Sequence, residues 1–134
     1  MELLIMNRDP GKPDDWGVCQ AIVKPMEMGW QAALNEVRVD TSAVPDRVYS
    51  VDMVETFYDV KGHCINLTPV FVAFFDYEQE TRPMLPDVSS MWIDAYEAEK
   101  HLPLVRQREV LKVIYHDYFV REPSEELKVY PSRY

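Results

Sequence analysis

The stretch KPMEMGWQAALNEVRVDTSAVP, residues 24–45, predicts an acidic helix between two loops. Pro25 precedes the helix, which we expect over residues 29–40, and a Ser-Ala-Val-Pro segment follows it. Two of its acids, Glu36 and Asp40, are four residues apart and therefore share one helical face. A third acid at position 39 would complete a cation site, but the sequence has Val39 there. The helix is a metal-binding helix, a damaged one, or a solvated amphipathic helix.

Length and composition predict one folded domain over residues 1–134. The hydrophobic content of 47% is enough for a buried core. No apolar run has transmembrane length, and the amino-terminal segment lacks the pattern of an export signal. The two cysteines, Cys19 and Cys64, have no metal-ligand spacing. We therefore expect a cytoplasmic protein with reduced cysteines and no membrane partner.

The net charge of −9 bears on the class of partner. Binding to a nucleic acid polymer relies on Lys and Arg that neutralise phosphates, so this charge argues against it. A small phosphorylated ligand stays compatible with the charge, because one bound cation can reverse the local field.

The rest of the chain predicts strands with helices between and after them. Strands are expected over residues 2–8, 16–23, 47–58 and 64–75. Pro69 predicts a bulge or an edge position in the last of these. Asp94 followed by Glu97 predicts a capped short helix, and a longer helix is expected over residues 104–120 before an irregular tail. This order predicts an α+β sandwich in which helices flank a mixed β-sheet.

The acidic helix resembles part of the Nudix hydrolase signature, G-x5-E-x7-R-E-U-x-E-E-x-G-U, where U is a bulky aliphatic residue. When the R-E pair is placed on Asn35 and Glu36, the first glutamate falls on Glu27. The paired glutamates then fall on Val39 and Asp40. In the same register the two glycines of the signature fall on Ala21 and Ser42.

Segments outside the signature also resemble this superfamily in order and spacing. They are ELLIMNR (residues 2–8), PVFVAFF (69–75), WIDA (92–95) and RQREVLKVI (106–114). They are most similar to the branch that includes dATP and dihydroneopterin-triphosphate pyrophosphohydrolases. The resemblance implies a single Nudix-like α/β/α sandwich that begins without the usual first strand. A strand missing there would leave an edge open for a homodimer.

The resemblance also implies a site and its chemistry. In Nudix hydrolases the helix acids hold Mg²⁺ or Mn²⁺ against a diphosphate that water attacks, which assigns Glu36 and Asp40 as catalytic metal ligands. Glu27 is then a support near the phosphates, and Arg8 either contacts a phosphate or makes an ordinary surface ion pair. Val39 supplies no oxygen and Asp40 is shorter than glutamate, so we expect weak metal binding.

Three substitutions weaken the supports of that site. Ala21 and Ser42 replace glycines that allow a positive φ. Asn35 replaces an arginine that would pair with Glu27. We therefore expect a diverged protein in which hydrolysis is weak or lost, with or without retained binding of a phosphorylated ligand.

Two alternatives stay open. The first is an active Mg²⁺-dependent pyrophosphohydrolase that replaces the missing ligand with a loop carboxylate from Glu78, Glu80 or Asp87. The second is a non-catalytic interaction module that uses the old cleft or the surface around Trp30.

Overall fold

The computed structural model describes residues 1–76 and 80–131. The strands are β1 (Glu2–Asn7), β2 (Arg47–Asp59), β3 (Cys64–Phe74), β4 (Ser89–Asp94) and β5 (Lys128–Tyr130). The α-helices are α1 (Gly29–Thr41), α2 (Ala95–His101) and α3 (Val105–Ile114). A π-helical turn, Tyr115–Phe119, continues α3, and a 3₁₀ turn, Glu125–Leu127, precedes β5. The α+β architecture expected from the sequence is confirmed.

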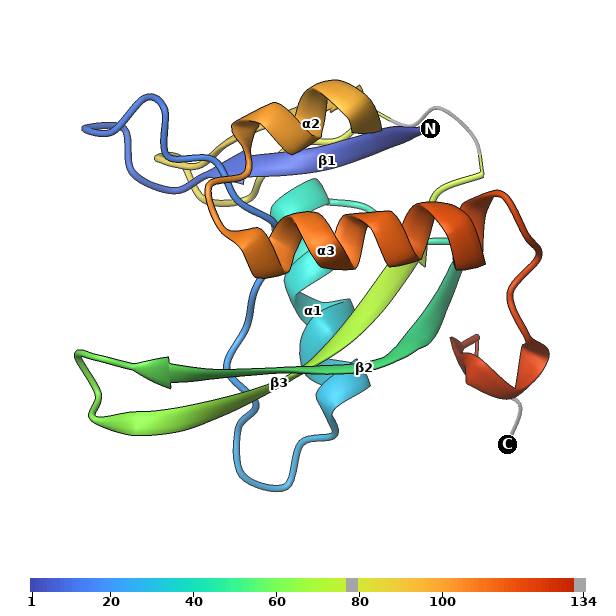
Figure 1. Ribbon diagram of the computed structural model, residues 1–134. Helices are drawn as coiled ribbons and strands as arrows, with labels where there is room; N and C mark the ends of the chain where they lie inside the picture. Colours follow the sequence, from blue (N-terminus) through green and yellow to red (C-terminus); the bar gives the residue numbers. More distant parts are fainter. Residues whose placement is uncertain (77–79, 132–134) are drawn as a thin grey trace.

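The strands form two antiparallel sheets. One pairs β1 with β4, so that Leu4 lies opposite Trp92. The other has the order β3-β2-β5. Figure 1 shows α2 over the β1–β4 pair and α3 running between this pair and the long β2–β3 hairpin. No helix in the described ranges is both long enough and apolar enough to cross a membrane.

Helix α3 and its π-helical extension contribute to two apolar cores. On one side Leu111 packs with Ile5, Ala98 and Leu102, where α2 covers β1. The second core is built on β2 and receives the buried Tyr118, whose hydroxyl donates a hydrogen bond of 3.0 Å to the Ser50 carbonyl. The two cores fix both sheets around this helix.

The β2–β3 hairpin bears out the prediction made from Pro69. The pairing register shifts between Ser50 and Val54, and Val54 lies opposite Pro69. A proline has no backbone N–H, so an irregularity beside it is expected. The turn at the far end contains His63 with a φ of 51°.

Three sequence predictions differ from the structure. The prediction of a strand over residues 16–23 is wrong, because within this range only Gly17 forms a β-bridge, and its partner is Met6. The tail is not wholly irregular, because β5 pairs with β2 through Val48 and Tyr49. The helix expected over residues 104–120 is α-helical only to Ile114 and then widens into the π-helical turn.

The predicted start of α2 is confirmed in part. Asp94 caps the helix by accepting a hydrogen bond of 2.9 Å from the Tyr96 amide. Glu97 pairs with Lys100, at 3.2 Å. The cap therefore works through the aspartate, while the glutamate makes an ordinary surface ion pair.

Candidate functional site

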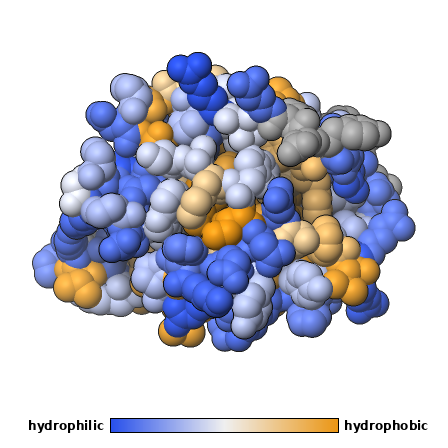
Figure 2. Space-filling model, turned by 90° about the horizontal axis from the view of Figure 1, so that it is seen from above, coloured by the Kyte–Doolittle hydropathy of each residue, from blue (hydrophilic) through white to orange (hydrophobic). Residues whose placement is uncertain are grey.

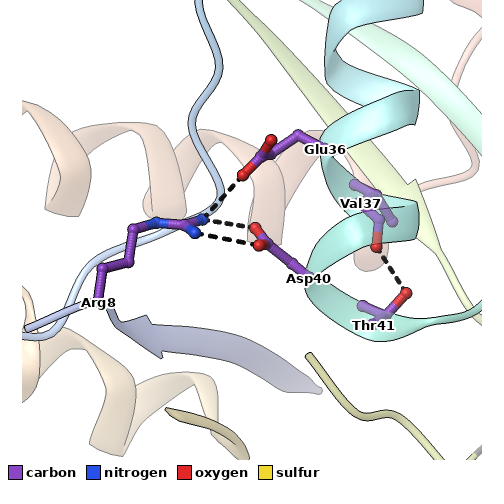
Figure 3. A network of polar contacts seen from close by, with 5 residues as sticks. All are labelled: Arg8, Glu36, Val37, Asp40 and Thr41. Atoms are coloured by element: carbon purple, nitrogen blue, oxygen red, sulfur yellow. Dashed lines mark hydrogen bonds and ion pairs between the residues drawn. The ribbon is translucent and has the colours of Figure 1, made fainter. Parts of the chain in front are cut away.

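The centre of the candidate site is an ion-pair cluster between the end of β1 and the last turns of α1 (Figure 3). Arg8, the first residue after β1, donates from Nη1 to Asp40 Oδ1 at 3.1 Å and from Nη2 to Asp40 Oδ2 at 2.6 Å. The same Nη2 lies 3.3 Å from Glu36 Oε1. Arg8 and Asp40 therefore form a two-point pair, the strong geometry for guanidinium and carboxylate.

Burial makes this pairing necessary. Asp40 is 1% exposed, whereas the side chains of Arg8 and Glu36 are 36% and 23% exposed. A carboxylate removed from water needs a close counter-charge and hydrogen bonds. Arg8 supplies both, and its hydrogen bond to Asp40 raises the pKa of the guanidinium further above its ordinary value. Asp40 is thus buried and its charge is compensated by Arg8.

Glu36 is the less well compensated acid of the two. Its burial and the nearby charge of Asp40 raise its pKa, and the positive charge of Arg8 opposes this rise only in part. The single contact at 3.3 Å, against two shorter ones for Asp40, gives the physical reason. Arg8 thus interacts more strongly with Asp40 than with Glu36.

Cys19 lies in the same electrostatic environment. Burial, followed by the charge of Asp40, raises the pKa of its thiol. A thiol with a raised pKa is a poor nucleophile and a poor metal ligand, because both roles require the thiolate. Cys19 is therefore a poor candidate for either role.

Comparison with solved structures identifies the architecture. The E. coli dihydroneopterin triphosphate pyrophosphohydrolase superposes with a TM-score of 0.68 over 83% of both chains, at 17% sequence identity. A C. elegans Ap4A hydrolase complex gives 0.67 at 20% identity, over 84% of this chain and 82% of that one. A MutT Nudix hydrolase from Burkholderia pseudomallei gives 0.62 at 21% identity, over 84% and 88%. The chain has a Nudix-like fold. No family model and no curated protein sequence matches it.

The structure brings together three of the four site residues predicted from the sequence. Glu36, Asp40 and Arg8 form one cluster. The sequence left two interpretations of Arg8 open, a phosphate contact and an ordinary ion pair, and in the structure Arg8 pairs with two carboxylates. That Arg8 is the partner of Asp40 was missed, and the one available signal was the opposite charge of an arginine at the end of a strand.

Glu27, the fourth predicted residue, stays within its own loop. Its Oε1 accepts a hydrogen bond of 3.1 Å from the Lys24 amide. In the described part of the chain no hydrogen bond or ion pair joins it to Arg8 or Asn35. Glu27 therefore shapes the entry to α1, and no hydrogen bond or ion pair within the described ranges joins it to the acid cluster.

The two signature positions that have lost glycine, Ala21 and Ser42, differ in backbone conformation. Ser42 ends α1 in the left-handed region, with φ 56°, as expected of a position that favours glycine. Ala21 has no positive φ; in this loop Met26 has one, at 67°. The loop before α1 therefore takes its turn five residues later than the signature register predicts.

The segment after β3 closes the end of α1. The Met84 amide donates to the Val39 carbonyl at 2.8 Å, and the Arg82 amide donates to the Thr41 carbonyl at 2.9 Å. Ser42 Oγ also donates to the Arg82 carbonyl. These bonds satisfy carbonyls that a helix end leaves free, and they hold this segment beside the position where the third ligand would be.

The residues do not fit a Mg²⁺ or Mn²⁺ site in this arrangement. Both helix carboxylates contact a guanidinium, and Val39 has no oxygen in its side chain. Among residues 1–76 and 80–131 no group of three or more His, Cys, Asp or Glu could hold a metal ion. Glu80 and Asp87 lie within those ranges and add no third ligand, while Glu78 lies outside the described residues.

Proposed function

We propose that this protein is a diverged Nudix-fold protein in which metal-dependent hydrolysis of a diphosphate linkage is weak or lost. The observation that carries the proposal is the two-point pair between Arg8 and the buried Asp40. Two carboxylates and one guanidinium leave the cluster with a formal charge of −1 (−2 + 1). A divalent ion would have to displace Arg8 and leave a positive side chain beside itself, which Coulomb repulsion opposes.

A phosphorylated small molecule is the ligand class to test. Two of the similar solved proteins are named for dihydroneopterin triphosphate and Ap4A, both of which contain linked phosphates. Arg8 is engaged by carboxylates, so binding of such a ligand would depend on other groups. Retained binding without turnover would appear as ligand-dependent stabilisation of the fold.

The test is turnover of a panel of nucleoside triphosphates and dinucleoside polyphosphates with Mg²⁺ or Mn²⁺. The variants are Glu36→Gln, which removes a carboxylate, and Val39→Glu, which restores the third one. Val120→Glu adds the same charge at an exposed position after α3 and serves as the matched control.

We expect wild type, Glu36→Gln and Val120→Glu to give the same background rate. Val39→Glu alone should stay inactive while Arg8 remains. A brisk metal-dependent wild-type rate that Glu36→Gln abolishes would refute the proposal. A slow metal-dependent rate that Val39→Glu increases would mean that hydrolysis is weak and has not been lost. Should activity instead fall in Glu80→Gln or Asp87→Asn, a loop carboxylate replaces the third ligand and the active-enzyme alternative holds, with Mg²⁺ or Mn²⁺ as cofactor.

A further inference from the structure

The outer part of the β2–β3 hairpin has one face of exposed, uncharged side chains. Beyond the bulge, directly opposed residues of the two strands share a face. We call the following set the hairpin face: Val54, Thr56, Tyr58, Ile65, Leu67 and Pro69. Its large members are well exposed, from 57% at Val54 to 70% at Leu67. Contiguous exposed apolar surfaces mark interaction sites in soluble proteins.

The opposite face of the hairpin is covered by the protein itself. Arg106 of α3 places Nε 3.3 Å from Glu55 Oε2, and its guanidinium lies 3.9 Å from the centre of the Phe57 ring. Those contacts shield the alternate side chains of the same strand. The hairpin is therefore packed on one side and bare on the other.

The bare side continues into the loop before α1. A β-carbon built on Gly29 would lie 3.5 Å from Pro69 Cγ, so α1 begins against the hairpin face. Met28 precedes Gly29 directly and is 59% exposed, and Met26 is fully exposed. Methionines are adaptable contact residues, and here they enlarge the hairpin face at its edge.

We propose that two copies of this chain pack through the hairpin face to form an isologous dimer. Charge determines where a second copy can bind at the least cost. With a net charge of −9, two copies repel each other, and the hairpin face has no charged side chain that would be buried on contact. The same patch on both partners is what a two-fold interface requires. The face over α2 is mostly hydrophilic with small separate apolar groups (Figure 2), and offers no comparable surface.

The area is also sufficient. If each large apolar side chain of the hairpin face and of the adjoining methionines offers on the order of 100–150 Å², the sum is roughly 600–900 Å² per copy. A standard specific interface buries about 800 Å² per partner. Two packed sheet faces lie about 10 Å apart with their strands nearly aligned, and we expect this arrangement for two copies of the hairpin.

The test is sedimentation velocity of the full chain from low to high micromolar concentration. We expect wild type to move from monomer to dimer as concentration rises. Leu67→Glu and Leu67→Lys should each weaken the dimer by about tenfold or more, because a charge would be buried without a partner. Val120→Glu and Val120→Lys, at a residue 60% exposed, serve as matched controls and should leave the dimer unchanged.

Circular dichroism checks that each variant folds. A second measurement, the rate of methionine oxidation, uses the wild-type chain and needs no substitution. Met26 and Met28 should be oxidised by peroxide more slowly at concentrations where the dimer forms. A wild-type chain that stays monomeric throughout, or a dimer indifferent to both Leu67 variants, would overturn the proposal. Weakening by Leu67→Glu alone would also overturn it, since that pattern reports net charge and no specific contact.

Discussion

Replacing Arg8 with methionine removes the guanidinium and keeps much of the side-chain length. Asp40, which is 1% exposed, would then be a buried carboxylate without its partner. Breaking a fully buried pair in this way costs about 3–5 kcal/mol, while an exposed pair contributes about 0–1 kcal/mol. The Arg8 side chain is 36% exposed, so water replaces part of the lost interaction. We expect an intermediate loss of about 2–3 kcal/mol in the free energy of unfolding.

Chemical denaturation measures this loss, and thermal unfolding gives a second reading. For 134 residues the entropy of unfolding is about 0.28 kcal/mol/K, which converts the loss into a fall in Tm of about 7–11 °C. Arg47 is the matched control, because its side chain is 34% exposed but its partner Asp76 is 42% exposed. Arg47→Met should therefore cost only about 1 kcal/mol.

A double-mutant cycle separates the pair from general effects. Asp40→Asn alone leaves Arg8 in contact with Glu36 and water, and should cost about 1 kcal/mol. The double variant Arg8→Met/Asp40→Asn should be more stable than the sum of the single losses by about 1–2 kcal/mol. Additive losses, or a loss for Arg8→Met no larger than that for Arg47→Met, would refute the reasoning.

Three further predictions follow from individual contacts. Burial and the charge of Asp40 raise the pKa of Glu36, so its neutral form stabilises the fold below the ordinary value of 4.5, and this contribution is lost as the pH rises through the raised value. Glu36→Gln should thus match wild type near pH 4 and be more stable at pH 7 by urea denaturation; a variant less stable at pH 7 would contradict this. His63→Gly should stabilise the fold by about 0.5 kcal/mol, because His63 has a φ of 51°, while Lys61→Gly in the same turn should destabilise it; equal effects in thermal unfolding would remove the backbone explanation. Tyr118→Phe should cost about 1–2 kcal/mol, because the Ser50 carbonyl loses its donor, and an unchanged denaturation midpoint would show that water replaces it.

The sequence predicted those elements whose signals are local. Glu36 and Asp40 were placed on one face by helical spacing, and α1 does extend over Gly29–Thr41. The two strands of the β2–β3 hairpin were predicted from their β-branched and aromatic runs, and Pro69 predicted a bulge or an edge position in the second one. The end of α1 at Ser42 followed from the position of a missing glycine. These features depend on residues within a few positions of each other.

The features that were missed depend on distant contacts. Residues 16–23 have a strand-like composition, but a strand needs a partner, and only Gly17 meets one. β5 is three residues long and is defined by its pairing with β2. The sequence of the polar tail contains no signal for this pairing. Arg8 and Asp40 are separated by 32 positions, so their pairing depends on where the end of β1 meets α1. The charges were visible in the sequence and the distance was not.

The central claim is that a guanidinium occupies the place that a divalent cation takes in an active Nudix hydrolase. A titration of the wild-type chain with Mn²⁺, followed by electron paramagnetic resonance of the free ion, tests it most directly. The account predicts no saturable binding to wild type and no difference between wild type and Glu36→Gln. A stoichiometric site in wild type that disappears in Glu36→Gln would contradict it.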